Sequence, residues 1–174
     1  MWEEHGFNST WHLLSPNVNG WFVTGSGDYN GDGTSDILWY NSSAQQLGIW
    51  EEHNFNPTWH LLSSNVNGWF VVGTGDYNGD GTSDILWQNS AGTQLGVWEE
   101  HNFNSTWHLL SPNENGWTVV GSADYNGDGT SDILWYNSSA QQLGVWEEHN
   151  FNATWHLLSS STNGWTIAGH IGEA

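Results

Sequence analysis

The chain has 174 residues, enough for one domain with its own core, and it carries 19 Asp and Glu but no Lys or Arg, for a formal net charge of −19. A chain without basic side chains is a poor partner for nucleic acid or for an anionic membrane surface, so neither is expected. No apolar run reaches the roughly 20 residues that span a bilayer, so we also expect no membrane insertion. The absence of Cys excludes disulfides and thiolate metal sites.

The sequence is an internal repeat. A tryptophan recurs every 48 residues, at Trp2, Trp50, Trp98 and Trp146. The segment DYNGDGTSDILW is written three times without change, starting at Asp28, Asp76 and Asp124. The chain therefore holds about 3.6 copies of a 48-residue unit. Periods of this length are typical of propeller blades and of helical repeats, and the local pattern decides between the two.

Each unit contains four short stretches rich in aromatic and β-branched residues, separated by Gly and Asn. In the second unit they read, in chain order, GWFVVGTGD, DILWQN, QLGVWEEHNF and TWHLLS. Such stretches between turn residues predict β-strands, and four strands per unit make one blade. The sequence therefore predicts an all-β fold, a single β-propeller domain over residues 1–174 built from four-stranded antiparallel blades.

The blade boundaries follow from the same pattern. Residues 2–15 supply the last two strands of a blade, three whole blades follow at 20–64, 68–112 and 116–160, and residues 164–170 supply one first strand. Because four blades is the low limit for a propeller, two chains that exchange ends and close eight blades are favoured over one ring with a defective blade. We expect a homo-oligomer of this kind, or a longer repeat chain of which this is a part.

The repeated loop has the chemistry of a calcium site. Asp28, Asn30 and Asp32 put side-chain oxygens at positions 1, 3 and 5 of the loop. The carbonyl of Thr34 and the carboxylate of Asp36 can serve at positions 7 and 9, and oxygen ligands alone favour Ca²⁺. An EF-hand is excluded because its position 12 needs a carboxylate, where every copy has Trp. The alternative is that NGDG is a simple hairpin turn.

The segment GDYNGDGTSDILW resembles FG-GAP or VCBS repeats, the integrin-like blades of calcium-stabilised β-propellers in extracellular adhesins, lectins and secreted bacterial proteins. The resemblance covers nearly the whole chain, and ILW after the loop, where the eukaryotic form has Gly-Ala-Pro, favours the bacterial type. It implies three Ca²⁺ per chain and secretion or display at the cell surface. The calcium ligands that it implies are Asp28, Asn30, Asp32, Thr34, Asp36, Asp76, Asn78, Asp80, Thr82, Asp84, Asp124, Asn126, Asp128, Thr130 and Asp132.

The fifteen tryptophans divide into two groups. Blades pack face to face and need large side chains between them, so Trp21, Trp39, Trp50 and their equivalents are expected in the core. The Trp of each TWH segment lies on the outermost strand and is expected to be more exposed. These candidate sugar-stacking residues are Trp11, Trp59, Trp107 and Trp155.

Each EEHNF segment and the TWH that follows it predict a hairpin. If its tip is the residue pair 104 and 105, His101 and His108 are direct cross-strand neighbours, and Glu99 shares their face. A Glu and two His could bind Zn²⁺ or Cu²⁺. The alternative is that these imidazoles make hydrogen bonds between blades.

An enzyme is not expected, because catalysis needs one asymmetric arrangement of residues and the repeats offer the same residues three times. Repeated equivalent pockets favour a calcium-stabilised, multivalent extracellular binding module, a lectin or adhesin for neutral glycans. The alternative is a structural or assembly protein with no small ligand beyond Ca²⁺.

Overall fold

The computed structural model describes residues 2–5, 8–11, 13–14, 19–111 and 114–165. This part of the chain forms fourteen β-strands and no helix, so the all-β prediction is confirmed. A helix with the length and apolar character needed to cross a membrane is likewise missing from these ranges.

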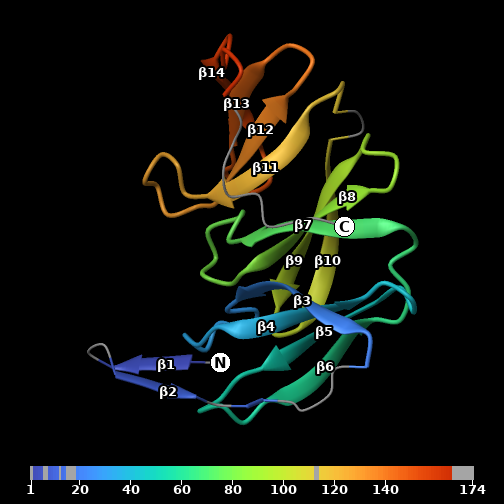
Figure 1. The fold of residues 1–174 in the computed structure, drawn as a ribbon, viewed down its shortest axis with the longest axis vertical. Helices are drawn as coiled ribbons and strands as arrows, with labels where there is room; N and C mark the ends of the chain where they lie inside the picture. Colours follow the sequence, from blue (N-terminus) through green and yellow to red (C-terminus); the bar gives the residue numbers. More distant parts are fainter. Residues whose placement is uncertain (1, 6–7, 12, 15–18, 112–113, 166–174) are drawn as a thin grey trace.

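The strands form one two-stranded hairpin and three four-stranded antiparallel sheets in which strand order follows the chain (Figure 1). The hairpin consists of β1 (Trp2–His5) and β2 (Asn8–Trp11). The first sheet consists of β3 (Trp21–Gly27), β4 (Asp36–Asn41), β5 (Gln46–Glu51) and β6 (Thr58–Ser63). The second consists of β7 (Trp69–Gly75), β8 (Asp84–Asn89), β9 (Leu95–His101) and β10 (Asn104–Ser111). The third consists of β11 (Thr118–Ala123), β12 (Asp132–Asn137), β13 (Gln142–Glu147) and β14 (Thr154–Ser159).

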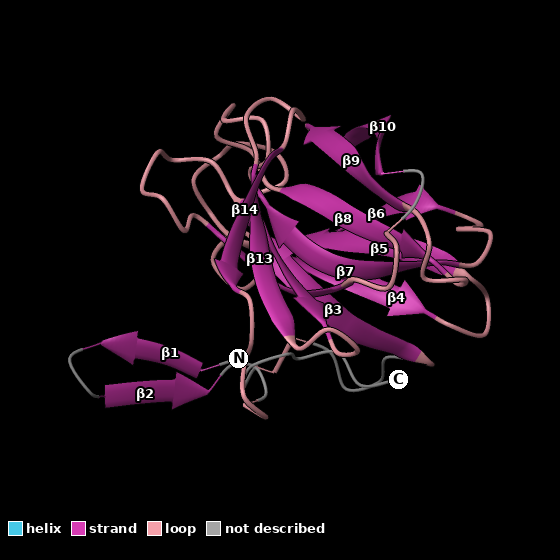
Figure 2. Cartoon of the chain, turned by 90° about the horizontal axis from the view of Figure 1, so that it is seen from above, coloured by secondary structure: helices cyan, strands magenta, loops and turns pink. Residues whose placement is uncertain are grey.

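The three sheets lie within the segments 20–64, 68–112 and 116–160, and the hairpin lies within 2–15. The single strand expected at 164–170 falls almost entirely outside the described residues. The three sheets follow one another along the long axis of the molecule in Figure 1. Figure 2, which looks along that axis, shows the hairpin projecting away from them.

Each sheet has two different faces, because neighbouring residues of a strand point to opposite sides. Ile85 and Trp87 of β8 share one face, and cross-strand pairing puts Trp98 opposite Ile85 and Trp107 opposite Trp98. We call this side of each sheet the tryptophan face. The other side, which carries Leu86 in the second sheet, is the aliphatic face.

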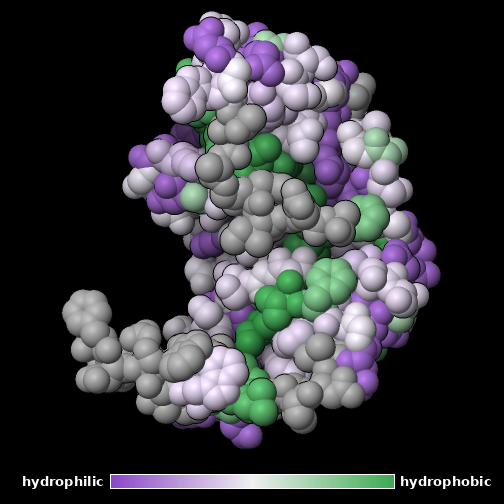
Figure 3. Space-filling view, viewed as in Figure 1, coloured by the Kyte–Doolittle hydropathy of each residue, from purple (hydrophilic) through white to green (hydrophobic). Residues whose placement is uncertain are grey.

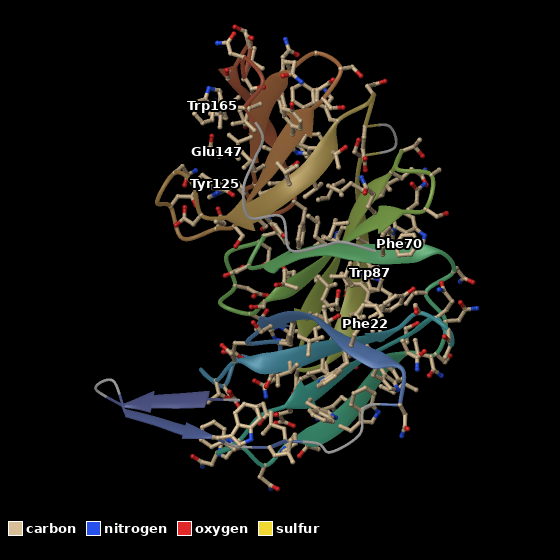
Figure 4. The ribbon with its side chains drawn as sticks, viewed as in Figure 1. Phe22, Phe70, Trp87, Tyr125, Glu147 and Trp165 are labelled. Carbon is tan, nitrogen blue, oxygen red and sulfur yellow. The ribbon has the colours of Figure 1, made fainter. Side chains whose placement is uncertain are left out.

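The aliphatic face of each sheet packs against the tryptophan face of the next. The buried cluster between the first and second sheets includes Leu38, Leu47, Ile49, Ile85 and Trp87. The cluster between the second and third includes Leu86, Leu95, Val97, Ile133 and Trp135. Figure 4 shows Trp87 in the space between the first two sheets. The second strand of the second sheet, β8, is apolar on both faces because both faces are covered by neighbouring sheets.

The outer faces of the stack are less covered. Val23, on the tryptophan face of the first sheet, is 55% exposed, whereas its equivalent in the third sheet, Val119, is 1% exposed. At the other end, Tyr125 is 49% exposed although its equivalent Tyr77 is fully buried. Figure 4 shows Tyr125 on the loop that projects from the third sheet, and Figure 3 shows a band of apolar residues at the surface of the lower part of the molecule.

The hairpin tip predicted at residues 104 and 105 is wrong. In the second sheet Asn104 pairs with His101, so the two-residue turn is Asn102 and Phe103, both with positive φ (52° and 62°). His108 pairs with Val97, and it is not a cross-strand neighbour of His101. A left-handed Phe is unfavourable by itself, and here its ring stacks on His60 of the first sheet at a centroid distance of 4.0 Å. This contact between sheets stabilises the turn.

Candidate functional site

The Asp-rich loop between β7 and β8 is closed by hydrogen bonds from its own backbone. Asp76 Oδ1 accepts from the N–H groups of Gly79 (2.6 Å) and Asp80 (3.1 Å), and Asp76 Oδ2 accepts from the N–H of Gly81 (2.8 Å). Asp80 Oδ1 in turn accepts from the N–H of Thr82 at 2.8 Å. The loops before β4 and β12 repeat this pattern. Glycine N–H groups thus hold the carboxylates at the start of each loop.

The last Asp of each loop lies deeper. Asp84 is buried and accepts from the N–H of Tyr77 (3.0 Å) and from the N–H of Glu100 on the third strand (3.1 Å). Burial raises the pKa of Asp84 to about 8. By contrast, hydrogen bonds from the hydroxyl and N–H of Thr34 lower the pKa of Asp32 in the first loop. Each loop therefore has one Asp with a lowered pKa near the surface and a second, deeper Asp with a raised pKa.

The residues of the loops suit a hard cation, since Asp28, Asn30, Asp32 and Asp36 and their equivalents supply only oxygen ligands. Among the described residues, no group of three or more His, Asp and Glu is arranged as a metal centre. As the structure stands, hydrogen bonds close the loops, so bound calcium remains a prediction.

The structure adds three buried carboxylates that the sequence analysis missed. Glu52, Glu100 and Glu148 are the second Glu of each EEH, and each donates its N–H to the last Asp of a loop. They are buried. Both side-chain oxygens of Glu52 and Glu148, and Oε2 of Glu100, have no hydrogen-bond partner in the described part of the chain, whereas Glu100 Oε1 accepts from the Ser105 hydroxyl. Burial raises the pKa of Glu100 and of Glu148 to about 7. Alternation could have found them, because the second Glu shares the buried tryptophan face with the Trp two residues before it.

The predicted Zn²⁺ or Cu²⁺ ligands are not brought together as a set. His108 Nε2 lies 2.8 Å from Glu99 Oε2, whereas His101 Nδ1 lies 3.7 Å from Asp80 Oδ2, so the two imidazoles have different carboxylate partners. His108 also stacks on Phe151 of the third sheet, at a centroid distance of 4.2 Å. His60 and His108, on the last strands of the first and second sheets, thus each pair with a Glu of their own sheet and stack on a Phe of the next sheet.

The tryptophans of one sheet form a row to which each strand contributes one residue. In the third sheet the first of them, Trp117, stands just before β11. Trp39, Trp87 and Trp135 are buried, as expected, and Trp21 and Trp50 are partly buried. The outer-strand residues are the more exposed ones, also as expected. Trp59, Trp107 and Trp155 are 42%, 41% and 42% exposed, and Trp11 is 56% exposed.

The ring of the outer Trp reaches over the third strand, where a Gly leaves room for it. A Cβ at Gly96 would lie 2.2 Å from the Trp107 ring, and the same close approach occurs between Gly48 and Trp59. The Trp107 ring also meets the ring of Trp69 edge to face, at a centroid distance of 4.9 Å. Gly at this position therefore makes the space for the aromatic row.

Two of these rows border cavities at equivalent places. The cavity of the second sheet, about 400 Å³, is bordered by Trp69, Trp87, Trp98 and Trp107 together with Val66 and Asn67 of the preceding loop. The cavity of the third sheet, about 270 Å³, is bordered by Trp117, Trp135, Trp146, Trp155, Glu114 and Asn115. The four Trp and the Asn of the smaller cavity are the repeat equivalents of those in the larger one, and Glu114 stands where the larger one has Val66. The larger cavity is also bordered by Asn65, Gln94 and Leu109.

An FG-GAP-like repeat matches residues 28–87 and again residues 76–135, together more than half of the chain. The chain belongs to the FG-GAP-like repeat family. Each match starts at the first Asp of a loop, and the first of them ends at the buried Trp87 of the next sheet. The FG-GAP-like unit therefore spans a loop, the rest of its sheet and the start of the following one. The comparisons with curated proteins and with solved structures find no match.

Proposed function

We propose that the three sheets are blades of a β-propeller and that their Asp loops bind three Ca²⁺ per chain. The head-to-tail packing of one sheet on the next supports the first part, as do the contacts of β7 with both β3 and β11, because blades arranged round an axis meet along their inner strands. The oxygen ligands of the loops support the second part. Bound Ca²⁺ supplies positive charge beside buried carboxylates such as Glu100 in a chain without Lys or Arg.

On this scaffold, the protein is a secreted or surface-displayed, non-catalytic module that binds neutral glycans at several equivalent sites. The observation that carries this proposal is the pair of equivalent cavities, each bordered by four Trp with an Asn beside them. Aromatic walls with a few polar groups suit the apolar face and the hydroxyls of a sugar ring. Because the sites repeat, weak binding at each adds up by avidity.

A glycan array probed with the full chain in millimolar Ca²⁺ tests the glycan proposal. We expect binding to neutral glycans, and we expect Trp107→Ala combined with Trp155→Ala, one from each cavity, to abolish it while the circular dichroism spectrum and melting temperature stay close to those of the parent. The proposal is contradicted if no neutral glycan on the array is bound and no monosaccharide binds in solution at millimolar concentration.

The uncovered outer faces favour a second function, in assembly. Val23 on the first sheet and Tyr125 on the third are half exposed, whereas their equivalents Val119 and Tyr77 are buried. A second copy of the chain, or further repeats, would cover these faces and close a ring. Light scattering distinguishes the cases, since assembly predicts a mass above that of the 19.4 kDa chain. A clean monomer excludes the two-chain ring.

A further inference from the structure

One contact between sheets departs from the repeat. Where the first sheet has Tyr40 and the third has Tyr136, the second has Gln88. Where the loop into the second sheet has Val66, the loop into the third has Glu114. The two replacements are in contact, because Gln88 Nε2 donates to Glu114 Oε2 at 2.6 Å. The second and third sheets therefore meet here through a Gln–Glu hydrogen bond, where the first and second sheets have Tyr40 and Val66 in one buried cluster.

Glu114 is a buried carboxylate with one unused oxygen. The residue is 4% exposed, and after the contact with Gln88 its Oε1 has no hydrogen-bond partner within the described residues. Burying a carboxylate is costly unless a donor or a cation compensates it. Since the chain has no Lys or Arg, it cannot supply a permanent positive charge of its own.

Glu114 borders the smaller of the two cavities. The other residues round it are Trp117, Trp135, Trp146, Trp155 and Asn115. Indole rings attract cations through their quadrupole, and Trp does so better than Tyr or Phe. Four Trp and one carboxylate therefore favour a positively charged group, and the net charge of −19 raises the concentration of cations near the protein.

The kind of cation follows from hydrogen bonding. A primary ammonium carries three N–H donors that all need acceptors once water is removed. A methylated ammonium carries no N–H donor in its quaternary form, so apolar rings and one carboxylate satisfy it. We propose that the Glu114 cavity binds the quaternary ammonium group of a small ligand, while the Val66 cavity at the equivalent place does not. This goes beyond the glycan proposal and does not depend on it.

The test is calorimetric titration of the full chain, in millimolar Ca²⁺, with choline and with 3,3-dimethylbutan-1-ol, its neutral isostere of the same shape. We expect choline to bind at least roughly tenfold more tightly than the isostere, as a desolvated cation–aromatic contact implies. Glu114→Gln keeps the contact with Gln88 and removes the charge, so it should weaken choline binding and leave binding of the isostere unchanged. Glu114→Val restores the residue of the equivalent loop and serves as a second variant in case the first does not fold.

A matched pair of tryptophan variants locates the site. Trp155→Ala, beside Glu114, should weaken choline binding roughly tenfold, whereas Trp107→Ala, at the same position of the Val66 cavity, should leave it unchanged. Equal binding of choline and the isostere, or choline binding that is unchanged in Glu114→Gln, overturns the proposal and makes Glu114 and Gln88 a structural pair only. If no glycan on the array is bound but choline binds as expected, the result contradicts the glycan proposal and leaves the choline proposal in place.

Discussion

The backbone N–H of Ser83 donates a hydrogen bond to the carbonyl oxygen of Asp28 at 2.6 Å, which joins the loop of the second sheet to the loop of the first. The same bond recurs between Ser131 and Asp76 at 2.6 Å. The three loops thus form one connected series along the stack. A substitution in one loop should therefore also alter the stability of the contact between neighbouring sheets.

A tyrosine at this contact gives the first prediction. The Tyr77 hydroxyl is fully buried and lies 2.7 Å from Ser122 Oγ of the third sheet. Tyr77→Phe removes the bond and leaves a polar group without its partner, so the free energy of unfolding should fall by about 1 kcal/mol in urea denaturation. Tyr125→Phe is the matched control, since this half-exposed residue should change stability by less than about 0.5 kcal/mol. Equal effects of the two variants would show that the contact between sheets contributes nothing.

The second prediction concerns the glycine beneath an outer tryptophan. A Cβ in Gly96→Ala would lie 2.2 Å from the Trp107 ring and 2.9 Å from the carbonyl oxygen of His108. The ring must move, and we expect a loss of about 1 to 3 kcal/mol in the free energy of unfolding. In the double variant with Trp107→Ala the ring is gone, so part of the loss should be recovered. Strictly additive effects of the two changes contradict this explanation.

The third prediction is a pH dependence at Glu114. Burial raises its pKa above the usual value, although the hydrogen bond from Gln88 opposes the change. A carboxyl group with a raised pKa in the folded state contributes stability that is present below its unfolded value of 4.5 and is lost as pH rises through the folded pKa. Relative to Glu114→Gln, the parent should therefore become less stable as pH rises, by about 1.4 kcal/mol for each unit of the shift. Parallel stability curves for parent and variant from pH 4 to pH 8, without choline, would contradict this.

The strands and the exposure of the tryptophans could be predicted because they depend on local pattern. DILW reads as a short apolar strand wherever it occurs, and Trp107 on the last strand is exposed while Trp87 on the second is buried. The face-to-face packing of repeats also follows, because each sheet is apolar on both sides. These features require only the period of the sequence and the alternation of strands.

The hairpin tip and the Glu114 cavity could not be predicted in this way. Asn102 and Phe103 form the turn in left-handed conformations, and the contact that supports Phe103 comes from His60, more than 40 positions earlier in the chain. The cavity joins Glu114 to Trp residues from four places in the following unit, so its shape exists only after packing. The sequence nevertheless contains a signal for it, since Glu replaces Val66 at this point of the repeat.

The fourth prediction assigns calcium to individual loops. Asp80→Ala removes the carboxylate at position 5 of the second loop, the one that Thr82 holds by its N–H and hydroxyl. Titration against a chromophoric chelator should show loss of one of three bound equivalents, with the two unchanged loops as an internal control. Retention of all three equivalents would exclude Asp80 as a ligand.

If the loops bind Ca²⁺, binding should stabilise the folded chain. Thermal unfolding measured in excess chelator and again in millimolar Ca²⁺ tests this. With the 10⁻⁴ to 10⁻³ M dissociation constants of extracellular calcium modules, 1 mM Ca²⁺ should add about 0.4 to 1.4 kcal/mol per independent site. We therefore predict a melting temperature that rises with Ca²⁺ and falls again on chelation. Superimposable melting curves would contradict calcium stabilisation of the fold. The hydrogen bonds that Gly79 and Gly81 donate to Asp76 would then suffice to close the loop as an ordinary turn.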